Sequence, residues 1–389
     1  LHSLRRRQRQ MCIRDRFNYM PVRDESIQNL YETSRQHYTL GEGYVGIASV
    51  EGELPVEFSL QTGLRSFSRK YDIPYMRHGS ENIFHTVGFI SGALNEEQHV
   101  GIALGMDNLI YDAEQADYTL LQLNPYYTLE NDNIRLRVGA HVDWQSANGS
   151  GIKAAPDVKL DYTFADTYVA YLHATGGTRL NDFRQQNEES PYWGVINQMR
   201  TSYTPADLQV GFKASPLPGL GFHLFGGYRV TKDEIFHLPG ITDTDFPYCY
   251  SLLMQEKAKV GYGGIKAAYG YKDIFDFSVG GTYYGWNVKD EAKVLLYLKP
   301  EFVLDASARA KVYDEFWISA AYRYEGRVKA GELEKADAIN NLSLSAGYEF
   351  FKSLNVFVRF NNLLNQDYIT EAGYPVQGFN AMAGVSFRF

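Results

Sequence analysis

Two stretches near the carboxyl end decide the fold: Leu354–Leu363, which reads LNVFVRFNNL, and Asn380–Phe389, which reads NAMAGVSFRF. In both stretches apolar and polar residues alternate, and the second one ends on an aromatic residue. Alternation with a period of two places one set of side chains on each face of a β-strand. We therefore expect each stretch to form a strand with one apolar face and one polar face.

The same alternation recurs in many segments upstream. Ile134–Gln145, Phe275–Tyr284, Leu304–Val312, Phe316–Arg327 and Leu342–Phe350 each separate an apolar set of side chains from a more polar set. No charged residue falls in the apolar sets. Because a charge on a lipid-facing strand position costs about 2–4 kcal/mol at the middle of a bilayer, this pattern favours a face that contacts lipid.

The composition favours a barrel in a membrane. The chain of 389 residues holds 30 tyrosines and 35 glycines, and 15% of its residues are aromatic, yet its mean hydropathy is only −0.34. An apolar outer face combined with a polar inner face produces such values. The net charge of −8 argues against nucleic acid as a partner, and the two cysteines allow at most one disulfide and no metal array.

The connections between the expected strands alternate in length. Short turns such as Glu130–Asn133 and Ala165–Thr167 alternate with long polar segments such as Arg179–Ala206 and Thr231–Leu253. Bacterial outer-membrane barrels collect short turns at one end and long loops at the other, whereas a soluble sandwich has no reason to do so. The fold class that we predict is all-β, a transmembrane antiparallel up-and-down β-barrel.

The pattern gives about 17 strands, from residue 39 to the final strand at 380–389. Because single-chain bacterial barrels have even strand counts, Ser26–Ser34 is a candidate for an eighteenth strand, and otherwise the barrel is incomplete. Residues 1–16 hold six arginines and one acid. We expect them to be a non-native or disordered leader, with a basic targeting arm as the alternative. Residues 17–389 are expected to form the barrel domain.

One motif at the carboxyl end goes beyond alternation. Residues Phe360–Tyr368 read FNNLLNQDY, and Gly373-Tyr374-Pro375 and the final strand follow. This ending resembles that of TonB-dependent outer-membrane receptors, in which an asparagine–leucine turn, a tyrosine and a proline–glycine loop precede the last strand. Residues Pro375–Gly378 read PVQG, where that family often has proline-glycine-arginine.

The resemblance implies location in the outer membrane of a Gram-negative bacterium and uptake of a scarce nutrient such as a siderophore, haem, cobalamin or a glycan. It also implies outer-membrane lipid, an N-terminal plug domain and the TonB complex as partners. Plugged barrels of this kind have about 22 strands, so we expect this chain to be the C-terminal part of such a barrel, without its plug. A complete passive porin of about 18 strands is the alternative.

Polar and aromatic side chains supply the candidate site residues. Those on the inner face would contact a plug or a passing solute, or would pair across strands and hold the barrel. Aromatic residues in the long segments would stack on a ligand or pack loop on loop. The lumen-wall candidates are Arg135, Arg137, His141, Asp143, Asp305, Arg309, Lys311, Arg323 and Arg359, and the ligand-contact candidates are Tyr192, Trp193, Phe246, Tyr248 and Tyr250.

The sequence holds no recognisable catalytic or metal constellation, so we expect neither an enzyme nor a cofactor; a barrel hydrolase is the weakest of the three hypotheses. His141 and Asp143 share a face, but no nucleophile occupies a recognisable position beside them. Asp243 and Asp245 offer oxygen ligands for calcium without the spacing of an EF-hand loop. The glycines of Gly261–Gly264 are expected to mark a bulge or to give a neighbouring side chain room.

Overall fold

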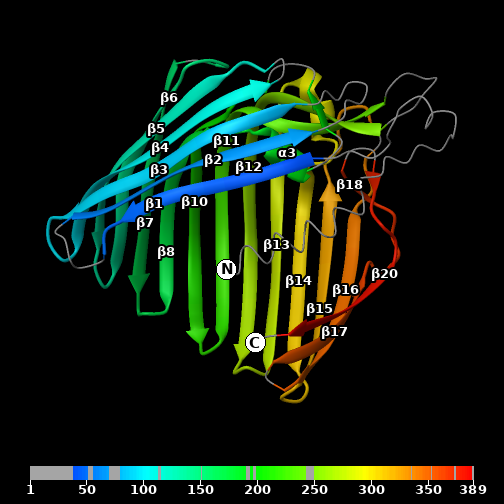
Figure 1. Ribbon diagram of the computed structural model, residues 1–389. Helices are drawn as coiled ribbons and strands as arrows, with labels where there is room; N and C mark the ends of the chain where they lie inside the picture. The colour runs from blue at the N-terminus through cyan, green and yellow to red at the C-terminus, as the bar shows by residue number, and fades with distance from the viewer. Residues whose placement is uncertain are drawn as a thin grey trace.

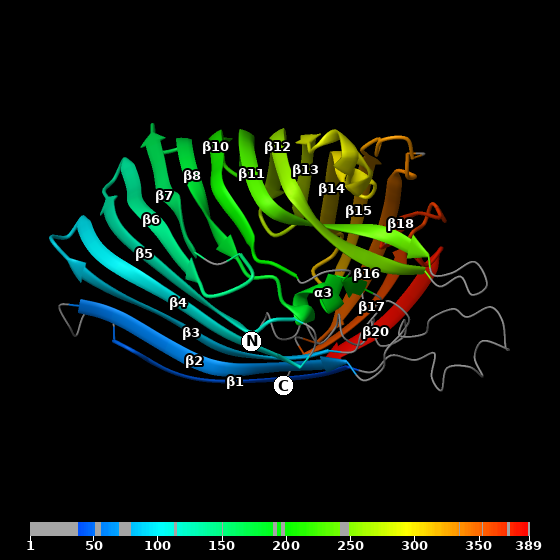
Figure 2. The same ribbon diagram turned by 90° about the horizontal axis from the view of Figure 1, so that it is seen from above.

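The computed structural model shows a single large antiparallel sheet that curls round an interior (Figures 1 and 2). It describes residues 38–50, 56–69, 79–112, 115–149, 151–189, 193–195, 199–241, 249–333, 335–351, 353–371 and 374–387. The long strands are β1 (Tyr38–Ala48), β2 (Val56–Arg69), β3 (Ser80–Ala93), β4 (Gln98–Asp112), β5 (Tyr118–Glu130), β6 (Ile134–Gln145), β7 (Gly151–Phe164), β8 (Tyr168–Arg179), β10 (Ser202–Leu217), β11 (Leu220–Ile241), β12 (Cys249–Tyr271), β13 (Phe275–Asn287), β14 (Pro300–Lys311), β15 (Phe316–Arg327), β16 (Ile339–Phe350), β17 (Leu354–Asn361) and β20 (Asn380–Phe387).

Seventeen strands run up and down, each paired antiparallel with its neighbour in the chain, as the alternation predicted. Among the described residues, β1 pairs only with β2 and β20 pairs only with β17, so the sheet is open between these two strands. The candidate eighteenth strand at residues 26–34 lies outside the described residues, as does Phe389.

The outer face of the sheet is apolar and the inner face is polar. On β6, Val138 and Trp144 are 46% and 44% exposed, whereas Asp143 and Gln145, which point the other way, are 2% and 1% exposed. On β11, Leu224 is 58% exposed. A soluble protein rarely exposes so broad an apolar surface, and lipid is the environment that favours it. The facing predicted from the sequence is therefore confirmed.

The connections are segregated as predicted, with short turns at one end and longer segments at the other. The short turns include residues 131–133, 165–167 and 218–219. The longer segments carry α3 (Phe183–Glu189), β9 (Trp193–Val195), the 3-10 helix η1 (Asp290–Leu296), β18 (Ile369–Glu371) and β19 (Tyr374–Pro375). Neither described helix is long and apolar enough to cross a membrane.

One predicted loop is wrong. The sequence assigned residues 231–253 to a long loop, but β11 continues to Ile241 and β12 begins at Cys249. A register shift between Thr231 and Glu234 interrupts the ladder, with Asp233 in the left-handed region at φ 54°. The polar residues between Thr231 and Glu234, which suggested a loop, form a β-bulge, and the pairing of β11 with β12 resumes after it.

Candidate functional site

Part of the chain between β8 and β10 lies inside the curl of the sheet. Its described residues, 180–189, 193–195 and 199–201, contain α3 and β9, and Figure 2 shows α3 within the interior; we call these residues the inserted segment. Its apolar side chains Leu180, Phe183, Trp193 and Met199 pack in one buried cluster with inward-facing residues of the sheet. Those wall residues are Phe67, Ile83, Leu109, Tyr111, Tyr118, Leu120, Ile235 and Leu253.

A buried carboxylate on β3 holds the N-terminus of α3. Glu81 is 1% exposed, and its two side-chain oxygens accept hydrogen bonds from the backbone N–H groups of Phe183 (2.7 Å) and Arg184 (2.9 Å). Asp182 lies beside them, 3.6 Å from a guanidinium nitrogen of Arg65 on β2. Burial raises the pKa of the Asp182 carboxyl. The N–H groups that a helix leaves unpaired at its start are thus met by side chains.

Beyond the start of α3, the inserted segment contacts β11, β2 and β12. Glu189 Oε2 lies 2.8 Å from His237 Nε2 on β11, and this contact holds the pKa of the Glu189 carboxyl below its ordinary value. Arg69 of β2 donates a 3.1 Å hydrogen bond to the carbonyl of Trp193 and stacks on its ring at 4.5 Å. Backbone pairing of β9 with β12 adds a third attachment.

Most of the loop aromatics that were predicted to contact a ligand lie outside the described residues. Trp193 is 4% exposed and packs against Phe183 with ring centres 5.2 Å apart, which is the loop-on-loop alternative. Tyr192, Phe246 and Tyr248 lie outside the described residues, and only the backbone of Tyr250 is described, in β12. Asp243 and Asp245 also lie outside the described residues. The ligand-contact role of these aromatics therefore stays a prediction.

The lumen-wall candidates on β6 make polar contacts across strands. Arg137 Nε lies 2.6 Å from Asp157 Oδ2, and its Nη2 donates to Asn124 Oδ1 at 2.6 Å. Arg135 pairs with Glu130 at 2.5 Å in an exposed position near the short turns. These contacts are of the kind that holds neighbouring strands together.

His141 and Asp143 both lie beside Gly177 of β8. A β-carbon at Gly177 would lie 3.4 Å from His141 Cγ and 3.6 Å from Asp143 Oδ2. The same Asp143 oxygen accepts a 2.6 Å hydrogen bond from the backbone N–H of Thr178, where the strand turns through Gly177 at φ 119°. The carboxylate therefore stabilises the irregular end of β8. No group of three or more histidine, cysteine, aspartate or glutamate side chains in the described part of the chain forms a potential metal site.

A second polar network crosses β14 and β15. Arg323 bridges Asp305 (3.0 Å) and Glu325 (2.7 Å), and Glu325 also pairs with Arg327 at 2.6 Å. Arg327, which is 3% exposed, donates to the carbonyl of Ile369 at 2.8 Å. The network thereby connects the wall to the segment that precedes the last strand.

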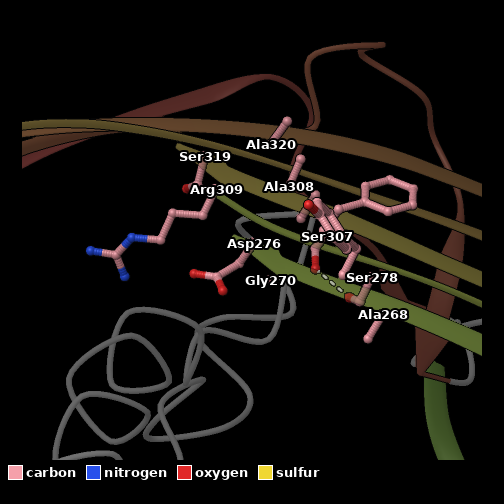
Figure 3. Close-up of a pocket in the computed structure, with 12 residues that line it drawn as sticks. Ala268, Gly270, Asp276, Ser278, Ser307, Ala308, Arg309, Ser319 and Ala320 are labelled. Carbon is pink, nitrogen blue, oxygen red and sulfur yellow. Dashed lines mark hydrogen bonds between the residues drawn. The ribbon is translucent and has the colours of Figure 1, made fainter. Parts of the chain in front are cut away.

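A cavity of about 360 Å³ opens beside this network, near the short turns (Figure 3). Asp276, Ser307 and Arg309 line it, and Ser307 Oγ lies 2.8 Å from Ser278 Oγ. Figure 3 shows Asp276 and Arg309 extending to the same side. Of the remaining wall candidates, Arg359 Nε donates to Ser345 Oγ at 3.4 Å, and Lys311 ends β14 opposite Trp317.

A set of aromatic rings lies across glycines on the inner wall, and the sequence suggested such a contact only for the glycines of residues 261–264. At each pair a β-carbon on the glycine would come within 3.0 Å of the ring, so no other residue fits without displacing it. The signal is a glycine opposite an aromatic residue, which is readable only once the register is known. The pairs are Tyr44–Gly63, Tyr126–Gly101, Tyr171–Gly211, Phe225–Gly264, Tyr262–Gly227, Trp317–Gly347 and Phe357–Gly384.

Several of these rings also carry a cation. The guanidinium of Arg137 lies 3.8 Å from the centre of the Tyr126 ring, and that of Arg309 lies 4.8 Å from the Trp317 ring. Gly264, in the run 261–264, makes room for Phe225, as one of the sequence hypotheses proposed. Cations over ring faces interact favourably with the ring quadrupole, so each ring is held between strand and cation.

The asparagine motif before the last strand forms a compact turn. Asn362 is buried, has φ 48°, and its Nδ2 donates to the carbonyls of Gln366 (2.9 Å) and Gln377 (3.2 Å). Asn365 Oδ1 accepts the backbone N–H of Phe379 at 2.8 Å. Side-chain amides that replace missing backbone partners are a known stabiliser of such turns. The motif quoted from the sequence thus positions the start of β20.

Comparison with known proteins rests on structure, because no family model and no curated protein matches the chain. The copper transporter OprC aligns with a TM-score of 0.65 at 13% identity, over 90% of this chain and 65% of its own. The FrpB iron transporter from Neisseria meningitidis gives 0.68 at 11% identity, over 91% and 64%. The siderophore receptor PirA from Acinetobacter baumannii gives 0.70 at 10% identity, over 94% and 64%.

The fold is that of a TonB-dependent receptor barrel. The resemblance expected from the carboxyl-terminal motif is therefore confirmed at the level of the fold, and with it the architecture of an outer-membrane barrel. The chain spans less than two thirds of the length of each of these structures.

Proposed function

We propose that this chain is the C-terminal part of the barrel of a TonB-dependent receptor in the outer membrane, which takes up a scarce nutrient as part of the whole protein. The plug domain and the first strands belong, in this proposal, to the remainder of that protein. The chief support is the shared fold with transporters and receptors for copper, iron and siderophores. We propose uptake, not catalysis, because those structures are transporters and receptors.

The two outer edges of the sheet support the proposal of an incomplete barrel. Among the described residues, β1 and β20 each leave one side without a strand partner. Unpaired strand edges are not tolerated in the hydrocarbon of a bilayer, because their N–H and C=O groups have no water to bind. Further strands would complete the barrel. They would also bring the number of strands closer to that of plugged transporters, which is about 22.

The test is uptake by cells that carry or lack the gene for the whole protein. Uptake of labelled siderophore-bound iron, copper, haem and cobalamin should fall for one of these cargoes when the gene is removed. It should also fall in the parent strain when an uncoupler abolishes the proton gradient. Gene-dependent uptake that survives the uncoupler would contradict the proposal and favour the passive channel.

A further inference from the structure

Three lysines stand on the outer face of the sheet, near the end that carries the longer segments. Lys257 and Lys259 of β12 are exposed, and an even number of residues separates them from Ile265, which is 57% exposed on the outer face. Lys232 of β11 is also exposed, and an even number of residues separates it from Leu224 on the same face. Even spacing along a strand places side chains on one face. The three lysines therefore point away from the interior, and nothing that fills the interior covers them.

The lysines lie close together on two adjacent strands. The register of β11 and β12, which are neighbours in the sheet (Figure 1), sets Lys232 across from Lys257 within the bulge. Like charges directly opposite each other destabilise a sheet, so this arrangement is unfavourable without a further partner. The flanking strands supply none, because Lys232 pairs in register with Tyr203 of β10, and Lys259 pairs with Asn287 of β13.

The carboxylates nearest to the lysines in the chain are engaged by other cations. Among the residues that the structure describes, no carboxylate forms an ion pair with Lys232, Lys257 or Lys259. The carboxylates of the bulge and its register partner pair instead as Asp233 with Arg200 at 3.8 Å, Glu234 with Arg179 at 3.7 Å, and Glu256 with Lys289 at 3.4 Å.

Tyr203 brings a fourth cation to this surface. The Lys232 ammonium lies 5.7 Å from the centre of the Tyr203 ring, and the Lys153 ammonium of β7 lies 5.5 Å from the centre of the same ring. The ring is held in place by its hydroxyl, which donates a 2.6 Å hydrogen bond to the carbonyl of Ala154. Contact with a ring face favours both ammonium groups but leaves their positive charge uncompensated.

The lysines lie at the depth expected for lipid head groups. Tyr228 of β11 is 46% exposed on the outer face, and such rings mark the edge of the apolar band of a membrane barrel. Its register partner is Gly261, two residues before which comes Lys259. With about 3.3 Å per residue and a tilt of about 40°, Lys259 lies about 5 Å beyond the ring and Lys232 about 10 Å beyond it. The head-group layer is about 5–7 Å thick on each side, and a lysine side chain is long enough to reach into it.

We propose that Lys232, Lys257 and Lys259 bind the phosphorylated head group of a lipid in the outer leaflet of the membrane. Long loops of bacterial barrels lie on the outer side, which assigns the leaflet. Ammonium groups make charge-assisted hydrogen bonds to phosphate oxygens, and basic side chains beside a membrane attract anionic lipids. The acyl chains of the same lipid would lie on the apolar band below the lysines. This site belongs to the outer face and does not depend on the uptake role.

The test is native mass spectrometry of the whole protein that contains this chain, purified in detergent and titrated with diphosphoryl lipid A. The wild type should retain the lipid with a saturable Kd, and Lys257→Gln and Lys259→Gln should each raise that Kd about fivefold. Lys257→Arg, which keeps the charge, should retain binding. Lipid A without its phosphates should bind at least about twentyfold more weakly, because only apolar contacts remain.

The matched control is Lys329→Gln, which removes the same charge from an exposed lysine after β15, at the same end of the barrel but three strands away from β12. Its Kd should stay within about twofold of the wild-type value. A cooperative urea transition and an unchanged circular dichroism spectrum verify that each variant is folded.

Three results would overturn the proposal. They are equal binding of dephosphorylated lipid A, an equal loss in Lys329→Gln, and binding of inorganic pyrophosphate as tight as that of the lipid, which would assign the lysines to a free anion. Because the assay uses neither cells nor an energy source, its failure is separate from failure of the uptake role.

Discussion

The indole of Trp317 on β15 covers Gly347 on β16, where an added β-carbon would lie 2.5 Å from Trp317 Cζ2. Arg309 of β14 stacks on the same ring. Three adjacent strands are therefore joined by one layered contact of glycine, indole and guanidinium. Glycine–ring pairs of this kind recur round the wall and give part of the chain's glycine and aromatic residues a shared structural role.

Because the Trp317 ring lies against Gly347, a side chain added at this position should destabilise the protein. Gly347→Ala should displace the Trp317 ring from the wall and lower the free energy of unfolding by about 1–3 kcal/mol, the usual cost of overpacking. Urea unfolding in detergent measures that change, and Trp317 emission should shift to longer wavelength. Gly221→Ala is the control, because its β-carbon meets nothing within 4 Å. Equal destabilisation by both substitutions would contradict this account.

Removal of the Glu81 carboxylate, which binds the N-terminus of α3, should release the inserted segment locally. Glu81→Ala leaves the backbone N–H groups of Phe183 and Arg184 without their acceptor. Each lost partner costs about 1–3 kcal/mol, so exchange of these amides should accelerate at least about tenfold. Hydrogen exchange with mass spectrometry measures this effect. The exposed Glu57→Ala on β2 is the control, and faster exchange there too would show that the effect is not specific to Glu81.

The pKa of Asp182 predicts how docking of α3 depends on pH. Burial raises this pKa above its ordinary value of 3.8, so the docked segment favours the protonated carboxyl. The stabilisation is fully present below the unfolded pKa and is lost as the pH rises through the folded pKa. Protection of the α3 amides, corrected for intrinsic exchange, should therefore fall as the pH rises. Asp182→Asn keeps an acceptor for the Gln185 N–H and should reduce the slope of this trend, with the remainder due to the neighbouring buried Glu81; an unchanged slope would refute the assignment.

Substitutions of Asn362, in the turn before β20, should separate the loss of its side-chain hydrogen bonds from backbone strain. Asn362→Gly removes the hydrogen bonds to Gln366 and Gln377 but tolerates φ 48°, and should destabilise by about 1–3 kcal/mol. Asn362→Ala should cost about 1 kcal/mol more, because alanine is strained in the left-handed region. Urea midpoints of the two variants give the difference. Identical midpoints would show that backbone strain plays no part.

The sequence revealed what is encoded locally. Alternation is a property of consecutive residues, so the strands, their facing and the segregation of turns were predicted correctly. The extension of β11 and β12 was missed, because the polar run around Asp233 reads as a loop and only pairing with β12 shows it to be a bulge. Trp193 was recognised as a loop aromatic, but its burial against Arg69 and Phe183 depends on how the loop folds back.

For the candidate site too, local features were predictable from the sequence and contacts between strands were not. That Arg137, Asp305 and Arg323 face inward was predictable from alternation, and their ion partners were not, because partners come from other strands.

The inserted segment has a mechanical consequence for the barrel. Its first end is fixed to β2 and β3 through Arg65 and Glu81, and its other end reaches β11 through the contact of Glu189 with His237. A link that crosses the interior from one side to the other acts as a strut. Any change in the separation of these strands must first break one of these contacts, so the shape of the lumen and the seating of this one segment change together.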